Sequence, residues 1–210
     1  NVNDLDYQQH IFAAYASYGY RFSKLTLKAG TRLEYTLNRG LSKSASGNLT
    51  FDNSNFNIVP YLNAAWKIDS RNTLSASYTR RLGRPSVTYL NPYIFEESPY
   101  SKMHGNPDLR TVVSDALTLT YRTSGETWDL TARTYGSLCN NKIEYLSEVY
   151  PDGGKVSTYR NAVIHNHIDE MLSFSWSPGE RFSLQTSAML GYNWFHAPSL
   201  EQKNDGIGWS

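Results

Sequence analysis

Apolar and polar residues alternate along the segment 55–68, which reads NFNIVPYLNAAWKI. One parity of this segment is wholly apolar, whereas its asparagines and its lysine fall on the other. A period of two predicts a β-strand with one apolar and one polar face, because successive side chains of a strand point to opposite sides. The alternation resumes at 73–81 after the turn residues Asp69 to Asn72, which predicts an antiparallel hairpin.

The same alternation recurs along the whole chain. We therefore predict an all-β fold, an antiparallel up-and-down meander of about eight amphipathic strands. Gly208 and Trp209 read as the beginning of another strand. The predicted strands are 10–22, 25–35, 55–68, 73–81, 116–122, 128–150, 155–176 and 182–194.

Two kinds of connection separate these strands. Short turns are expected near residues 23, 70, 125 and 179, and the segment Pro151 to Gly154 is expected to be a hairpin tip that extends beyond the sheet. Long connections are expected near 45, 95 and 197. The first of them, Arg39 to Asn53, is rich in serine, glycine and asparagine and is predicted to be a loop. A second loop, of about 30 residues, runs from Arg80 to Leu109, and loops of this length are uncommon in compact soluble domains.

Short turns at one end of the strands and long connections at the other are typical of a transmembrane β-barrel. A closed barrel also satisfies every backbone hydrogen bond, as the lipid interior requires. A soluble β-sandwich is the alternative, since its half-buried strands alternate as well. The aromatic positions favour the barrel, because aromatic girdles belong at the two membrane interfaces. Phe22, Trp66, Trp128, Trp176 and Phe182 lie near the short turns, and Tyr35, Tyr78 and Trp194 lie towards the long connections.

Composition excludes several classes of protein. The chain has 210 residues and no run of the roughly 18 apolar residues that a membrane helix needs. Its net charge of +1, with both signs mixed, gives no footprint for nucleic acid. A single cysteine, Cys139, excludes an internal disulfide framework.

Charged residues on the polar parity fit the hydrated interior of a barrel, where opposite charges on neighbouring strands can pair. Glu170 breaks this rule, because it interrupts an apolar parity. His165, His167 and Asp169 share one face and offer a metal site or an acid–histidine dyad, but a polar row lining the lumen explains them equally simply. We therefore expect no catalytic residue and no resident cofactor or metal. The predicted lumen-lining residues are Lys28, Arg32, Glu34, Lys67, Arg81, Arg122, Asp129 and Arg133.

The long loop after Arg80 carries several aromatic residues. Outer loops of barrels carry recognition, so these residues are candidates for ligand contact. Its Asn-Pro elements are expected to shape the loop instead, because proline fixes its own φ and restricts the residue before it. The candidate ligand residues are Tyr89, Tyr93, Phe95, Tyr100 and His104.

Three segments of the chain resemble a known family. The segment 78–86 reads YTRRLGRPS, 90–93 reads LNPY and 105–109 reads GNPDL, and in this order they resemble the barrel of TonB-dependent outer-membrane receptors of the Bacteroidetes-type outer-membrane β-barrel family. The segment 29–35, AGTRLEY, is similar to another strand of that family. The chain departs from the family at 111–114, where a Pro-Glu pair is usual, and at 166–168.

The resemblance implies a bacterial outer-membrane receptor that imports a scarce solute such as a metal chelate, a vitamin or a glycan. It implies that residues 1–210 are a single segment of a barrel of about 22 strands, without the plug domain and the closing strands. The implied partners are outer-membrane lipid, a small solute, and the TonB complex through the plug. Two other functions stay open: a stand-alone small barrel for adhesion or passive passage, and a soluble β-sandwich module that binds carbohydrate.

Overall fold

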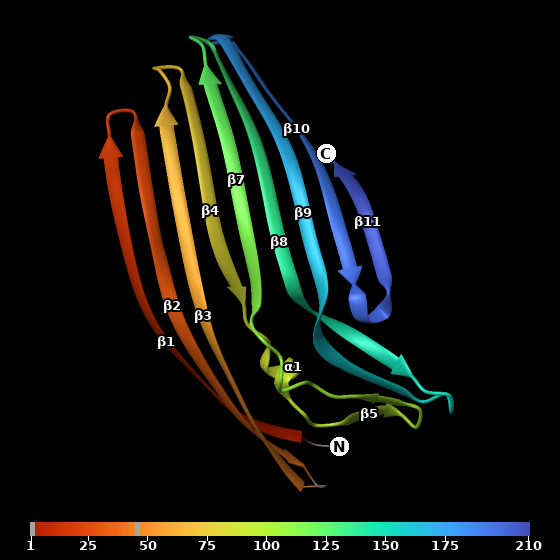
Figure 1. The fold of residues 1–210 in the computed structure, drawn as a ribbon. Coiled ribbons are helices and arrows are strands. Elements are labelled where there is room, and N and C mark those ends of the chain that lie inside the picture. Colours follow the sequence, from red (N-terminus) through yellow and green to blue (C-terminus); the bar gives the residue numbers. More distant parts are fainter. Residues whose placement is uncertain (1–2, 45–46) are drawn as a thin grey trace.

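The computed structural model describes residues 3–44 and 47–210 and forms one curved, open sheet (Figure 1). Its main path is an antiparallel meander in the order β1-β2-β3-β4-β7-β8-β9-β10-β11, and β5 and β6 belong to the loop between β4 and β7. The described residues include no helix long and apolar enough to cross a membrane. The elements are β1 Asn3–Phe22, β2 Leu25–Ser44, β3 Gly47–Lys67, β4 Asn72–Gly83, α1 Val87–Leu90, β5 Phe95–Ser98, β6 Ser101–Met103, β7 Val112–Ser124, β8 Trp128–Val149, β9 Lys155–Gly179, β10 Phe182–Ala197, the 3-10 helix Pro198–Leu200 and β11 Gln202–Trp209.

The predicted meander is confirmed, and the four short turns lie together at one end of the sheet (Figure 1). We call this the turn end and the opposite one the loop end. The turn after Lys67 shows why these connections can be short. The carboxylate of Asp69 accepts hydrogen bonds from the backbone N–H groups of Arg71 and Asn72, at 2.8 and 2.9 Å. This arrangement closes the hairpin locally.

The predicted loop at Arg39 to Asn53 is wrong. β2 and β3 continue through it as a paired ladder from Leu37↔Ser54 to Ser44↔Gly47, and residues 45 and 46 lie outside the described residues. The polar side chains that suggested a loop are bonded across strands instead. The Ser42 hydroxyl donates to the Asn3 side chain at 2.8 Å, and Asn53 accepts from the Asn38 side chain at 3.1 Å, so the extension is a sheet with a polar surface.

The predicted long connection near residue 197 is also wrong. A single 3-10 turn at Pro198–Leu200 joins β10 to β11, and Glu201 closes it with a φ of 53°. Strand β11 starts at Gln202, before the predicted Gly208, and raises the meander to nine strands. The predicted hairpin tip at Pro151 to Gly154 is confirmed, because β8 and β9 run beyond the last β10 pair at His196↔Ile164.

The register gives the sheet two unlike faces, since directly paired residues of antiparallel strands share a face. One cross-strand row runs Lys28, Asn63, Ser77, Thr118, Tyr135 and Asp169, and we call its side the polar face. The next row runs Leu27, Ala64, Ala76, Leu119, Thr134, Glu170 and Leu190 on the apolar face. All five tryptophans lie on the apolar face with the second row.

The apolar face is uncovered. Phe12 is 61% exposed and Leu117 59%, and the described residues form one sheet with no second layer. A β-sandwich would bury these side chains between two sheets. The sandwich alternative is therefore wrong.

Candidate functional site

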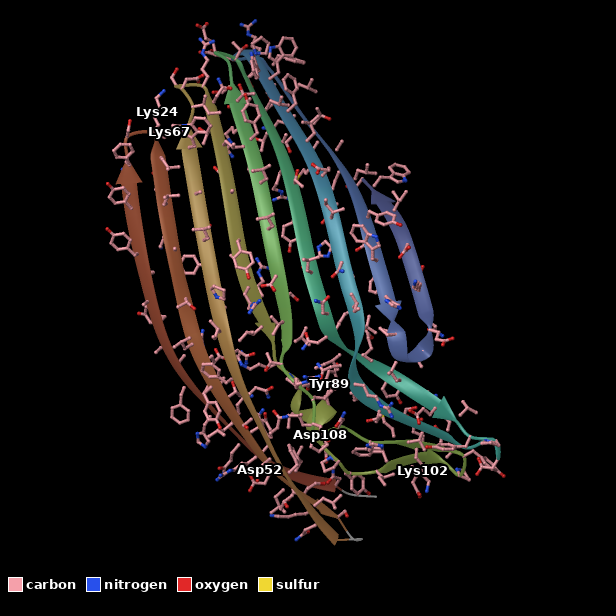
Figure 2. The ribbon with its side chains drawn as sticks, in the orientation of Figure 1. Lys24, Asp52, Lys67, Tyr89, Lys102 and Asp108 are labelled. Carbon is pink, nitrogen blue, oxygen red and sulfur yellow. The ribbon has the colours of Figure 1, made fainter. Side chains whose placement is uncertain are left out.

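The segment between β4 and β7, residues 84–111, folds inward over the polar face at the loop end (Figures 1 and 2). Alternate asparagines of β3, whose side chains belong to the polar face, bind its backbone. Asn53 donates to the carbonyl oxygens of Pro107 and Leu109 at 2.7 and 2.8 Å, and the Thr111 N–H donates to Asn55 at 3.2 Å. We call the segment 84–111 the inward loop.

Asparagines of β8 and β9 bind the end of the inward loop. The side chain of Asn161 accepts from the Arg110 N–H at 2.8 Å and donates to the Arg110 carbonyl at 3.0 Å. Asn141 donates to the Thr111 carbonyl at 2.8 Å and accepts from the Val113 N–H at 3.0 Å. These side chains satisfy backbone groups that have no strand partner, which ties the loop to both sides of the wall.

The hairpin β5–β6 attaches the inward loop to a free strand edge. Beyond the last β10 pair, no described strand pairs with β9 on that side until β6 does so in parallel, from Ser101↔Lys155 to Met103↔Ser157. The His104 N–H adds a bond to the Ser157 carbonyl at 3.1 Å. The loop thus completes the sheet edge at the loop end.

The two motifs of the inward loop bind each other. The Gly105 N–H donates to the Asn91 carbonyl at 2.8 Å, and the Asn106 N–H donates to the Tyr89 carbonyl at 2.6 Å. A Cβ on Gly105 would lie 2.5 Å from the Asn91 oxygen and 2.6 Å from the Tyr89 oxygen. Only glycine permits this approach of two backbones, so the motif residues shape the loop as expected.

A buried carboxylate, Glu34, connects the inward loop to β2. It is 1% exposed and bonds the Arg84 guanidinium, whose Nε lies 3.1 Å away, and the Arg32 guanidinium at 2.6 Å. The AGTRLEY and YTRRLGRPS motifs therefore meet in space, although 50 residues separate Glu34 from Arg84. This interaction ties the start of the inward loop, at Arg84, to β2.

The underside of the inward loop contains a small apolar core. Leu90 is fully buried and packs with Phe51 and Leu109. The Tyr89 and Tyr159 rings stack beside this core with centroids 4.0 Å apart. Burial raises the pKa of the Tyr159 phenol, an effect that the neighbouring tyrosines increase.

The candidate ligand residues do not form one cluster. Tyr89 is committed to its stack on Tyr159, and Tyr93 is 7% exposed with its ring edge-on to Phe95 at 4.7 Å. Tyr100 is 69% exposed at the tip of the β5–β6 hairpin. The Nδ1 of His104 lies 2.7 Å from the Gly105 carbonyl.

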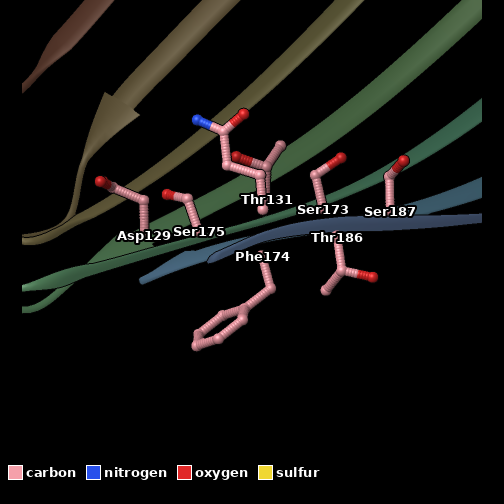
Figure 3. Close-up of a pocket in the computed structure, with 8 residues that line it drawn as sticks. Asp129, Thr131, Ser173, Phe174, Ser175, Thr186 and Ser187 are labelled. Carbon is pink, nitrogen blue, oxygen red and sulfur yellow. The ribbon is translucent and has the colours of Figure 1, made fainter. Parts of the chain in front are cut away.

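All eight predicted lumen-lining residues lie on the polar face by register. They extend from Lys67 at the turn end, labelled in Figure 2, to Glu34, which pairs with Arg84 of the inward loop. The same face carries a hollow of about 330 Å³ near the turn end of β8, β9 and β10. Phe174 and Thr186 point to one side of the sheet, and the other labelled side chains, Asp129, Thr131, Ser173, Ser175 and Ser187, point to the other side (Figure 3). A hollow of about 590 Å³ lies by Phe195 and Glu144 at the loop end.

The histidine pair forms a row on the polar face. His165 stacks on Phe195 at 4.0 Å, and the ring of His167 is 5.5 Å from that of His165. Asp169 lies 3.8 Å from the His167 Nε2, whereas Glu170 lies on the opposite face, as the sequence predicts. No cluster of three or more histidine, cysteine or acidic side chains that could hold a metal occurs in the described ranges.

Sequence reasoning missed the residues that hold the inward loop. Arg84 stands in a recognised motif, but nothing in the motif names Glu34 as its partner. Asn53 and Asn55 alternate with other residues at a period of two, which is a usable signal, but the loop prediction for 39–53 concealed it. Asn141 and Asn161 carry no local signal.

Solved structures of outer-membrane transporters have the same fold. The copper transporter OprC matches with a TM-score of 0.68 at 14% identity, covering 94% of this chain and 31% of that chain. The siderophore receptor PiuA from Acinetobacter baumannii matches with 0.58 at 12% identity, covering 92% and 26%. The FrpB iron transporter from Neisseria meningitidis (F3-3 variant) matches with 0.56 at 13% identity, covering 97% and 27%. The chain thus spans about a third or less of these proteins.

A comparison with curated proteins finds no match. The model of the outer membrane protein beta-barrel family matches residues 1–210, the whole chain. This match agrees with the amphipathic meander and with the likeness to outer-membrane transporters. The chain therefore belongs to the outer membrane protein beta-barrel family and to the bacterial outer membrane.

Proposed function

We propose that the chain is part of the barrel wall of a TonB-dependent receptor that imports a scarce solute across the outer membrane. The inward loop is the observation that carries this proposal. Four asparagines, a buried carboxylate and a strand edge fix this segment across the polar face. A segment in this position narrows the outer opening of a barrel. Copper and iron transporters that share the fold support it. The partial coverage of those proteins supports a longer parent chain with a plug, through which TonB would act.

In this proposal, the apolar face and the polar face of the sheet are in contact with different surroundings. The apolar face, with its tryptophans, contacts outer-membrane lipid, where aromatic girdles are stabilising. The polar face, with Lys28, Arg32, Glu34, Lys67, Arg81, Arg122, Asp129 and Arg133, lines the lumen. Phe95 and Tyr100 are the exposed members of the candidate ligand set and are proposed to meet the solute from the loop side, near Tyr93 and His104.

Energy-dependent uptake tests the proposal. We would delete the parent gene and measure uptake of radiolabelled copper, ferric chelates, cobalamin and oligosaccharides, with and without a protonophore. The expected result is that the deletion strain no longer takes up one class of these solutes. The intact strain should take up that class only without the protonophore. The parent should migrate in the outer-membrane fraction at several times the 23.9 kDa of this chain. A band near 23.9 kDa, or uptake insensitive to the protonophore, would instead favour a small passive barrel.

A further inference from the structure

The polar face is basic, although the chain is close to neutral with a net charge of +1. The region from the turn end to the level of Glu34 on β2, Arg81 on β4 and His165 on β9 carries most of these charges. In it, the described strand residues of the polar face include seven basic side chains and three acidic ones. The acidic residues are Glu34, Asp129 and Asp169. The basic residues are Arg21, Lys28, Arg32, Lys67, Arg81, Arg122 and Arg133.

The acidic side chains do not neutralise this excess. Glu34 already forms ion pairs with both Arg32 and Arg84, and a carboxylate oxygen of Asp169 lies 3.8 Å from the His167 Nε2. Asp129 makes no ion pair with another described residue. In the described part of the chain, six of the seven basic side chains therefore have no carboxylate partner. By contrast, basic side chains at the loop end have carboxylate partners. Lys142 pairs with Glu144 at 2.8 Å, and Arg160 pairs with Glu148 at 2.7 Å.

The unpaired cations follow the wall from the turn end to the underside of the inward loop. Arg21 and Arg133 lie on one cross-strand row, and Lys67 and Arg122 lie on the next towards the turns. Lys28 lies on the next row towards the loop end from that of Arg21 and Arg133. Arg81 lies still closer to the inward loop, opposite Ser114. Their cross-strand neighbours in these rows are uncharged, for example Ser75 and Thr120 in the row of Arg133.

Unpaired cations on a wall with a low-dielectric interior concentrate anions, and anion pores use arginine and lysine for this purpose. We propose that the polar face is the path of a small anionic solute, one that carries carboxylate or phosphate groups or is a negatively charged metal chelate. The inference rests on the proposed import function and adds the charge class of the solute.

A thiol placed among the cations measures the local potential without knowledge of the solute. Thr120 is suitable, because Arg133 is its register partner on β8 and Arg122 lies two residues along the same strand. We would make Thr120→Cys in the full-length protein with Cys139→Ser, in isolated outer membranes. The rates of modification by sulfonate-bearing and trimethylammonium-bearing methanethiosulfonates are then compared with those of a free thiol. We expect a preference for the anionic reagent of about 10-fold.

Charge variants and a second position show the source of the preference. Arg122→Gln and Arg133→Gln should each lower the ratio by roughly threefold at low salt, because these charges lie within a Debye length of the thiol. Ser187→Cys is the control on the same face, since it lines the hollow beside Asp129 and the first basic side chain along its row, Arg122, lies three strands away, beyond Ser173 and Thr131. It should show a smaller anionic preference than Thr120→Cys, because more strands separate it from the arginines.

Each other outcome overturns the inference in a distinct way. Equal rates, or a preference for the cationic reagent, would exclude an anionic path but leave a solute path and the import function intact. No reaction with either reagent would show that protein covers this face, so that the cations serve an internal contact. The uptake assay tests the import function separately.

Discussion

Glu34 is the residue at which the inward loop and the wall meet. Its carboxylate is 1% exposed and lies between two guanidinium groups that are a third to a half exposed. Removing one partner of a buried pair leaves the other charges uncompensated. We predict that Glu34→Gln lowers the stability of the loop attachment by roughly 1–3 kcal/mol, a value reduced for the exposure of the arginines.

Limited trypsinolysis of the full-length protein in outer membranes checks this prediction. Cleavage after Lys102 and Arg110, both in the inward loop, should accelerate in Glu34→Gln. Asp52→Asn is the control, because its pair with Arg39 is 3.4 Å long and both side chains are more than two thirds exposed. Equal cleavage in the two variants would mean that Glu34 does not hold the loop.

Gly105 is the second residue on which the loop depends. Alanine would place its Cβ within 2.8 Å of three backbone atoms of Tyr89 and Asn91, which cannot move without breaking the bonds between the motifs. We predict that Gly105→Ala destabilises the loop by about 1–3 kcal/mol and exposes the same tryptic sites. Gly206→Ala, where a Cβ meets no atom within 4 Å, should have no effect. Protection in both variants would refute the steric argument.

Individual residues were partly predictable from the sequence. The motifs marked Glu34, Arg84 and Gly105 because they stand at fixed places in recognised segments. Their partners were not predictable, since an ion pair across 50 residues depends on the path of the loop rather than on local pattern. The face of each charged residue was predictable, because a period of two needs only the strand and not its neighbours.

At the scale of elements, the inward loop is attached by asparagines that replace a missing strand partner. Asn161 donates its side-chain N–H groups to the carbonyls of Arg110 and Asn141, at 3.0 and 2.8 Å. Asn161→Asp keeps the shape but turns a carboxylate oxygen towards two carbonyls. We predict a loss of about 1–3 kcal/mol in loop attachment from these unmade bonds, largest at neutral pH and smaller when acid protonates the new carboxyl group.

Hydrogen exchange of the loop amides measures this loss. The amides of Arg110 and Val113 should exchange faster in Asn161→Asp at pH 7, after correction for intrinsic rates, and recover part of their protection below pH 4. Asn48→Asp on the exposed start of β3 is the control and should leave exchange unchanged. Unchanged protection in Asn161→Asp would show that the other attachments, such as the β6 pairing and Asn141, hold the loop without Asn161.

Element boundaries were less predictable than element type. Serine, glycine and asparagine at 39–53 suggested a loop because they are common in loops. In the structure the side chains of Ser42 and Asn53 bond across strands, to Asn3 and Asn38, outside the apolar region, where polar residues do not prevent pairing. The opposite error occurred near 197, where a single 3-10 turn closes a connection that the sequence suggested was long.

At the scale of the whole molecule, the spacing of the aromatic residues sets the depth of the sheet in the membrane. Trp176 on β9 and Trp194 on β10 are outward, and Trp194 pairs with Asn166, ten residues from Trp176 along β9. A rise of about 3.3 Å per residue and a tilt of about 40° convert this span into roughly 25 Å, the height of the apolar band of outer-membrane barrels. The ion pair of Arg80 and Asp115, at 2.8 Å, lies at the loop-side limit of this band, opposite Leu138.

Glu170 lies inside the proposed lipid band, about 15 Å from the level of Trp176 by the same rise and tilt. It is exposed between Ile168 and Leu172, and its bond is to the Thr134 hydroxyl at 2.9 Å. Acidic groups on a lipid face destabilise barrels, less than basic ones do. We predict that Glu170→Leu raises the free energy of unfolding in lipid vesicles by about 1–2 kcal/mol, measured from the urea midpoint. Asp169→Leu, one residue away on the polar face, should not raise it. A gain in both variants would mean that the two faces do not meet different solvents, and a gain in neither would mean that Glu170 has a partner within the membrane.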